Sequence, residues 1–204
     1  MTRIKRPDPI AFLARHGSTE LSDTGVIISR TDVRPDKEGT EQAENLIRFL
    51  DERDIQDVYS SPLKHCVTIA KRFAGHREVI QHRSLLPWDR GILTGVLSDE
   101  AEDLIKLLLT NPTVRIPHGE SRVEAEERIS ELFDTALKKA EDRTAVFFTH
   151  HTVIDFLNCL LLGERLDDPP NVVEVGGIAA IYVDGDGYTM EPVLHPAENT
   201  IAVS

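Results

Sequence analysis

The chain has 204 residues and a formal net charge of −12 at pH 7, and 40% of its residues are hydrophobic. This balance is typical of a folded globular protein and excludes a disordered or membrane-spanning chain. The sequence pI near 5.1 argues against a nucleic-acid binder, because contacts to phosphate backbones need clustered Lys and Arg side chains.

No stretch of the chain is apolar enough to span a membrane, and the first residues lack the apolar core of a signal peptide. We therefore expect a cytoplasmic protein with no membrane partner. The cysteines, Cys66 and Cys159, lie in apolar patterns of helical spacing, which predicts two buried free thiols rather than a disulfide.

Strands and helices are predicted to alternate along the chain. Residues 10–14 form an apolar run that predicts a buried strand, and Asp36 precedes apolar residues at helical spacing, which predicts an N-capped helix. Residues 85–95 contain proline, glycine and the tryptophan, and this composition predicts a loop. The predicted strands cover residues 10–14, 57–59, 144–148, 178–183 and 188–194, and the predicted helices cover 37–50, 62–73, 100–109, 125–137 and 151–162.

This alternation predicts an α/β fold, namely a three-layer sandwich with a largely parallel central sheet, helices on both faces and a C-terminal antiparallel hairpin. We expect residues 1–204 to form a single domain. Residues 85–120 are expected to form a loop and helix segment over the functional site. The side chains expected to line an entrance there are Trp88, Leu93, Ile116 and His118.

Polar clusters follow three of the predicted strands, and they are Arg15-His16, Ser60-Ser61 and His150-His151. Because ligands in such folds bind at the carboxyl ends of the strands, these clusters indicate a functional site. A guanidinium beside an imidazole favours the neutral, nucleophilic imidazole, and it also offers a planar fork to a phosphate group.

A zinc site made by His16, His150 and His151 is a competing interpretation. These histidines lack the i, i+4 helical spacing of a metalloprotease motif, and no acidic ligand lies at a diagnostic offset. The residues therefore favour a metal-free site.

Short motifs in a fixed order resemble those of the histidine phosphatase superfamily, which has the phosphoglycerate-mutase-like fold. The resemblance covers residues 10 to about 183, and it is the order of the motifs that makes it specific. The motifs are Arg15-His16-Gly17, the segment 32–43, the segment 59–64 (YSSPLK), the segment 117–121 (PHGES) and Thr149-His150.

The resemblance implies a phosphatase that hydrolyses a small-molecule phosphomonoester through a phosphohistidine on His16, with no metal and no cofactor. It implies that Arg15 and His150 bind the phosphoryl oxygens and offset the charge that develops on them. The backbone N–H of His151, near a helix start, would add a neutral donor.

The chain departs from the family pattern at positions of the expected site. His65 replaces a second arginine, which removes a permanent positive charge from the phosphate pocket. Pro87 stands where an acidic proton donor is expected, and Asp89 in the same loop is the best substitute acid. Ser22 replaces an asparagine and can still hydrogen-bond a phosphate oxygen. Glu120 is expected to orient the arginine of the pocket or a backbone turn rather than to perform chemistry.

Other functions stay open beside the phosphatase. One is a phosphoglycerate-mutase-type phosphotransferase, although the long insertions that such enzymes carry are not evident. The other is a catalytically impaired member of the fold that only binds a phosphate ligand. The expected partner is a small-molecule phosphate ester, and the edge of the terminal hairpin could also pair with a second copy of the chain in a homodimer.

Overall fold

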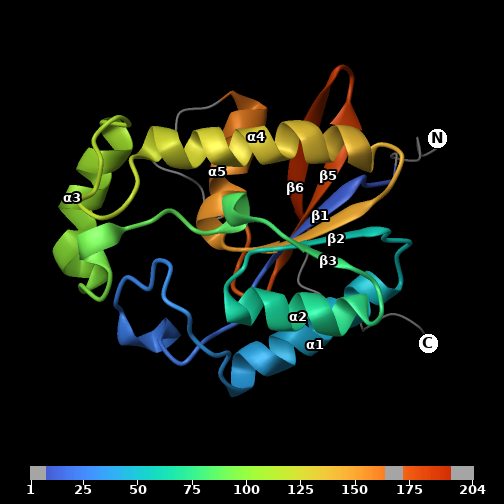
Figure 1. Ribbon diagram of the computed structural model, residues 1–204, viewed down its shortest axis with the longest axis horizontal. Coiled ribbons are helices and arrows are strands. Elements are labelled where there is room, and N and C mark those ends of the chain that lie inside the picture. The colour runs from blue at the N-terminus through green and yellow to red at the C-terminus, as the bar shows by residue number, and fades with distance from the viewer. Residues whose placement is uncertain (1–7, 164–171, 194–204) are drawn as a thin grey trace, which may run out of the picture.

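The computed structural model describes residues 8–163 and 172–193 (Figure 1). Within these ranges the strands are β1 (Ala11–Arg15), β2 (Asp57–Ser60), β3 (Val79–Gln81), β4 (Ala145–Thr149), β5 (Ile178–Asp184) and β6 (Gly187–Val193). The α-helices are α1 (Lys37–Asp51), α2 (Lys64–Ala74), α3 (Ser98–Thr110), α4 (Arg122–Ala140) and α5 (His151–Leu162). Short 3-10 turns are η1 (Ser22–Thr24), η2 (Arg83–Leu85) and η3 (Gly91–Leu93).

The strands form one sheet in the order β3-β2-β4-β1-β5-β6. The strands β3, β2, β4 and β1 run parallel, whereas β5 pairs antiparallel with both β1 and β6. The central strands β1 and β4 are almost entirely buried, as expected for parallel strands whose two faces are both covered by helices.

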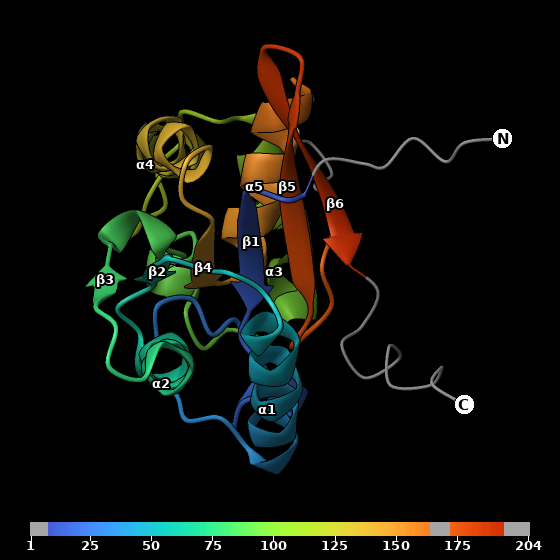
Figure 2. The same cartoon turned by 90° about the vertical axis from the view of Figure 1, so that its right-hand side faces the viewer.

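Helices cover both faces of the sheet, and each face has its own hydrophobic core (Figures 1 and 2). The helices α1 and α2 contribute Leu46 and Ile69 to one core, and α4 and α5 contribute side chains such as Phe133 to the other. Neighbouring residues of β4 serve different cores, because side chains alternate along a strand. Phe148 belongs to the core under α1 and α2, and Phe147 belongs to the core under α4 and α5.

The predicted α/β sandwich, with its mainly parallel sheet and its terminal antiparallel hairpin, is confirmed. Each predicted strand and helix ends within three residues of its observed bounds. The largest difference is at α4, which begins earlier because Ser121 and Glu124 form a capping box with each other's backbone amides. The short strand β3 was not predicted, since its three residues are only partly buried or exposed and carry no apolar pattern.

Both cysteines are buried and neither forms a disulfide, as predicted. None of the helices in residues 8–163 and 172–193 combines the length and the apolarity that a membrane crossing requires.

The loop that follows β1 packs against the start of α1. Asp36 joins the two, because its carboxylate accepts from the Gly39 amide at 2.7 Å and from the Ser18 hydroxyl at 2.5 Å. A Cβ atom on Gly39 would lie 1.9 Å from the carbonyl oxygen of Ser18, so only glycine fits this contact. The backbone just beyond His16 is therefore fixed by the helix that follows it in the chain.

The substitution Gly39→Ala should lower the free energy of unfolding by about 1–3 kcal/mol, because the added methyl group forces the Ser18 backbone to move. Urea denaturation measures this loss. The matched control is Gly187→Ala in β6, where the nearest atom to an added Cβ is 3.8 Å away and the backbone φ is not in the left-handed range. An equal loss in both variants would contradict the proposed contact.

Candidate active site

Three imidazole rings meet at the carboxyl ends of the central strands. His16 follows β1, His150 follows β4 and is the N-cap residue of α5, and His65 lies in the first turn of α2. The centroid of the His16 ring lies 4.4 Å from that of His65 and 5.1 Å from that of His150. The His65 and His150 centroids are 5.2 Å apart.

The pairing of β1 with β4 explains why two of these histidines meet. Arg15 pairs with Thr149 in the parallel register, and the His16 amide donates to the Thr149 carbonyl at 3.2 Å. Each chain then continues into a histidine at the same edge of the sheet. The sequence prediction that His16 and His150 share one site is consistent with this geometry.

Hydrogen bonds define which ring nitrogen carries the proton. Nδ1 of His16 lies 2.8 Å from the Gly17 carbonyl, and Nδ1 of His65 lies 3.3 Å from the Val33 carbonyl. A carbonyl oxygen only accepts, so Nδ1 carries the proton in both rings and Nε2 holds a lone pair when the ring is neutral. His150 differs, because its Nε2 lies 2.8 Å from the Ser61 hydroxyl, a group that can either donate or accept.

The imidazoles are held in their neutral forms. Burial, followed by the nearby charge of His65, lowers the pKa of His16 to about 3. Burial also lowers the pKa of His65, although the hydrogen bond to the Val33 carbonyl and the charge of Asp32 oppose that shift. Burial and repulsion from the other histidines hold the pKa of His150 well below its ordinary value. At neutral pH the cluster therefore presents lone pairs rather than positive charge.

A cavity of about 400 Å³ opens beside the imidazoles, which is the size of a pocket for a small molecule. Its walls include all but one of the residues predicted for the site, and these are Arg15, His16, Ser22, His65, His150 and His151. The segment 87–105 forms another wall through Pro87, Trp88, Arg90, Ser98 and Ile105. The helix α5 begins at His151, so the His151 amide is one of the N–H groups without an intrahelical acceptor.

Arg15 is the guanidinium beside the predicted nucleophile. Its Nη1 donates to the Val173 carbonyl at 2.7 Å, which anchors the side chain next to the cavity. Burial lowers the pKa of Arg15, and the nearby carboxylates of Asp155 and Glu174 oppose the shift. Arg15 thus stays a cation at neutral pH.

Asp89 is the predicted site residue that the structure does not bring to the cavity. Its Oδ2 accepts from Nη1 of Arg30 at 3.0 Å, and its Oδ1 accepts from the Gly91 amide at 3.0 Å. Asp89 is not among the residues that line the cavity. With both oxygens accepting from these partners, the carboxyl group is not placed to donate a proton to a ligand.

The entrance residues also need correction. Leu93 and Ile116 are buried in the hydrophobic core rather than at a cavity mouth, and His118 is exposed away from the cavity lining. Trp88 does line the cavity. The loop that contains Leu93 folds back as η3, and this turn carries the leucine inwards.

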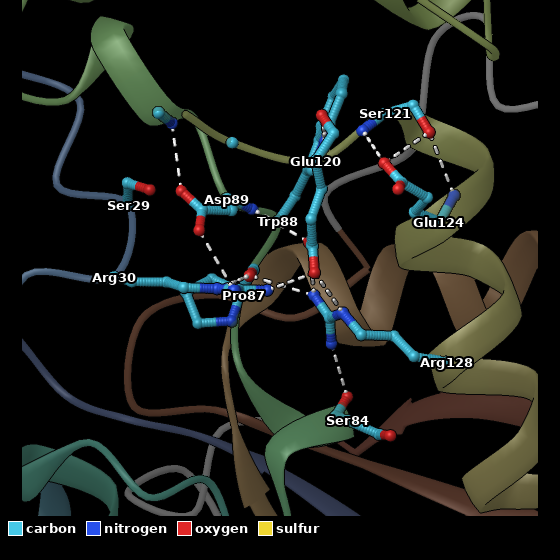
Figure 3. A network of polar contacts seen from close by, with 12 residues as sticks. Ser29, Arg30, Ser84, Pro87, Trp88, Asp89, Glu120, Ser121, Glu124 and Arg128 are labelled. Carbon is cyan, nitrogen blue, oxygen red and sulfur yellow. Dashed lines mark hydrogen bonds and ion pairs between the residues drawn. The ribbon is translucent and has the colours of Figure 1, made fainter. Parts of the chain in front are cut away.

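Glu120 is the centre of a polar network behind the Trp88 wall (Figure 3). Its carboxylate accepts from Arg30 and, through both oxygens at 3.0 and 3.1 Å, from Arg128. Arg30 and Arg128 also donate to the Pro87 carbonyl at 3.2 and 3.0 Å. Glu120 thus binds Arg30 and Arg128, neither of which lines the cavity, rather than the pocket arginine Arg15. It also accepts from the Asp89 amide at 3.2 Å, which agrees with the expectation that it orients a backbone turn.

The imidazole cluster is also the place where a metal ion could be held. Ring nitrogens of His16, His65 and His150 lie within 4.8 Å of one another, and this is the one such group found among the described residues. It differs from the zinc set considered from the sequence, because His65 takes the place of His151. Imidazole ligands of this kind suit zinc and related ions.

Comparison with known proteins agrees with this geometry. The model of the histidine phosphatase superfamily (branch 1) matches residues 11–193. Phosphoserine phosphatase 1 of Hydrogenobacter thermophilus is 27% identical over 162 residues, which cover 76% of this chain and 77% of that protein.

Solved structures show the same fold. A phosphoserine phosphatase of Entamoeba histolytica, in complex with 3-phosphoglyceric acid, superposes with a TM-score of 0.77 at 21% identity, over 91% of this chain and 98% of that one. The alpha-ribazole phosphatase of Shigella flexneri superposes with a TM-score of 0.73 at 21% identity, over 95% and 98% of the two chains.

The substitution Glu120→Gln should lower the free energy of unfolding by about 1–3 kcal/mol at pH 7, because Arg30 and Arg128 would lose a charged acceptor. Urea denaturation measures the loss, and the exposed Glu102→Gln, which breaks only a helical surface pair with Lys106, is the matched control and should change little.

The same variant should show a pH dependence of defined sign. Burial raises the pKa of Glu120, but the hydrogen bonds and charges of Arg128 and Arg30 outweigh it, so the pKa is below the ordinary 4.5. The stability difference between wild type and Glu120→Gln is therefore complete above pH 4.5 and shrinks as the pH falls through the folded-state pKa. A difference that grows in acid would contradict the ion pairing.

Proposed function

Because the chain belongs to the histidine phosphatase superfamily (branch 1), we propose that it hydrolyses small-molecule phosphate monoesters through a phosphohistidine on His16. The observation that carries this proposal is the His16 ring itself. Its Nδ1 donates to the Gly17 carbonyl, so the neutral Nε2 is left as a nucleophile at the cavity shared with Arg15 and His150.

In the first step, Nε2 of His16 attacks phosphorus and the bond from phosphorus to the ester oxygen breaks. The Arg15 guanidinium and the His150 ring stabilise the negative charge on the phosphoryl oxygens, and the His151 amide adds a neutral donor. The alcohol leaves with a proton taken from water, since Asp89 is held by Arg30 outside the cavity.

In the second step, water attacks the phosphohistidine, which releases inorganic phosphate and restores the neutral imidazole. The low pKa of His16 supports this role in both steps, because the ring stays unprotonated well into the acidic range. We assign no metal to either step, because Arg15 supplies the positive charge that a metal ion would otherwise supply.

The curated relative favours hydrolysis over phosphoryl transfer between positions of one substrate. The Hydrogenobacter protein is named as a phosphatase, and this chain matches about three quarters of it. The histidine at the nucleophile position also favours an enzyme over a protein that only binds phosphate, because mere binding needs no exposed lone pair at Nε2.

The substitution His16→Ala should reduce turnover of p-nitrophenyl phosphate by at least about 10³-fold, because the nucleophile is lost. Wild-type turnover should survive EDTA, and acid-labile phosphate should be trapped on the wild type but not on the variant. The exposed His76→Ala is the matched control. Activity that EDTA abolishes and Zn²⁺ restores would instead assign a metal ion to His16, His65 and His150.

The position of His65 generates a prediction about pH. When neutral, His65 offers a lone pair towards the phosphate, and when protonated it offers a charged donor. Burial holds its pKa below the ordinary 6.5, so phosphate binding should strengthen as the pH falls below 6.5 through that lowered pKa. The variant His65→Arg carries the charge at every pH and should exceed the wild type by about 10-fold in kcat/KM at pH 8.

The ratio of variant to wild-type kcat/KM is the quantity to measure, because the ionisation of p-nitrophenyl phosphate cancels in it. This ratio should fall as the pH drops below 6.5 and His65 becomes protonated. His65→Gln, which is neutral throughout, is the matched control and should lose activity relative to the wild type as the pH falls. Parallel pH profiles for all three proteins would show that His65 does not bind the phosphoryl group.

A further inference from the structure

Ser61 follows β2 directly, and the phosphoryl chemistry described above does not use it. Its side chain is completely buried and does not line the cavity. The Ser61 amide donates to the Phe148 carbonyl at 2.9 Å, so the end of β2 is paired with the end of β4. This pairing brings the Ser61 hydroxyl to 2.8 Å from Nε2 of His150, which is the distance of a hydrogen bond.

The two ring nitrogens of His150 have different surroundings. Nε2 contacts the Ser61 hydroxyl and lies 3.7 Å from Sγ of Cys66, and neither of these buried residues lines the cavity. His150 itself lines the cavity, and its side chain makes no hydrogen bond as the N-cap of α5. Nδ1 is therefore the nitrogen that remains for a ligand.

The position of the proton on the neutral ring decides what His150 offers to an anion. Burial and the charges of the other histidines hold the pKa of His150 well below its ordinary value, so the ring carries a single proton at neutral pH. With that proton on Nδ1, the ring donates a hydrogen bond to a phosphoryl oxygen. With the proton on Nε2, the ring presents a lone pair to the same oxygen, and the two repel each other.

The groups around Nε2 differ in their ability to donate to it. The thiol of Cys66 donates to the Thr149 carbonyl at 3.6 Å, so its proton is already engaged. The Ser61 oxygen accepts from the Leu63 amide at 3.4 Å, and the hydroxyl keeps a proton to give. The sulfur of Cys66 also interacts with Ser61, but a thiol sulfur is a weaker acceptor than an imidazole nitrogen. Ser61 is therefore the donor best placed for Nε2.

We propose that Ser61 is a positioning residue, which donates its hydroxyl proton to Nε2 of His150 so that His150 keeps its own proton on Nδ1 and presents it to the phosphoryl group. This rests on the proposed phosphatase function. It gives the polar cluster at the end of β2 a role that acts through His150 and not through contact with the substrate. The arrangement suits a site of neutral imidazoles, because the ring then stabilises negative charge as a fixed donor without being protonated further.

The tautomer can be measured directly by nitrogen-15 NMR of protein labelled in its histidines, because protonated and unprotonated ring nitrogens differ in chemical shift. The His150 signals are identified by their loss in His150→Gln. At pH 7 the wild type should show a protonated Nδ1 and an unprotonated Nε2, both alone and with inorganic phosphate. A protonated Nε2 in the wild type would overturn the proposal, and this measurement does not depend on whether any Ser61 variant folds.

The substitution Ser61→Ala removes the donor and should change the tautomer. Sγ of Cys66, at 3.7 Å, can then accept from Nε2, so the form with the proton on Nε2 should become populated. Ser61→Thr keeps a hydroxyl and should keep the wild-type tautomer. If Ser61→Ala retains the proton on Nδ1, Ser61 does not set the tautomer and the proposal is wrong.

Turnover gives a second measurement on the same proteins. Ser61→Ala should lower kcat/KM for p-nitrophenyl phosphate by about 10- to 100-fold, mainly through kcat, as expected for a lost hydrogen bond to a charged group. Ser61→Thr should recover most of this loss. The matched control is Ser60→Ala, because Ser60 is equally buried but its hydroxyl donates to the Ser61 carbonyl at 2.8 Å. The control should stay within about 3-fold of the wild type, and an equal loss in both alanine variants would contradict the assigned role.

If the wild type hydrolyses no phosphate ester, the proposed phosphatase function fails, and the spectrum together with phosphate binding then decides the role of Ser61. Calorimetry would compare the binding of inorganic phosphate to the wild type, Ser61→Ala and Ser60→Ala. Weaker binding in Ser61→Ala alone, with the changed tautomer, supports the positioning role without any turnover. Equal binding in all three proteins overturns it.

Discussion

The hydrogen bond from the His16 amide to the Thr149 carbonyl continues the β1–β4 ladder, and the candidate site depends on it. Parallel strands present their carboxyl ends at one edge of a sheet, so their next residues become neighbours however far apart they lie in the chain. The buried core on both faces makes the register of β1 and β4 costly to change. The stability of the sheet therefore also fixes the geometry of the two imidazoles.

The charge of the cavity depends on one side chain that is a cation at neutral pH and on three imidazoles that are charged only when protonated. Arg15 is a permanent cation, whereas His65, His150 and His16 are kept neutral by burial and by mutual repulsion. A neutral His16 is suited to attack phosphorus, but a neutral His65 weakens the attraction for the phosphate. The same burial that activates the nucleophile thus limits the charge of the pocket, and an arginine at position 65 would separate the two effects.

The sequence was sufficient to predict five of the six described strands, the helices on both faces of the sheet and the residues that directly follow strands. His16 and His150 belong to this group, because strand ends are set by a local apolar pattern and the topology then places them together. The loop residues could not be placed in the same way. Asp89 and Arg90 are adjacent, yet Asp89 pairs with Arg30 and Arg90 lines the cavity, because distant partners determine the direction of each side chain.

The polar network around Glu120 explains why Arg90 is left at the cavity without a carboxylate. The acidic groups near this wall, Glu120 and Asp89, are engaged by Arg30 and Arg128. A shortage of acidic residues is not the reason, since the chain has 35 Asp and Glu against 23 Lys and Arg. Arg90 nevertheless keeps its Nη1 buried without a hydrogen-bond partner beside the cavity, and the stacking on Trp88 replaces the lost hydration only in part.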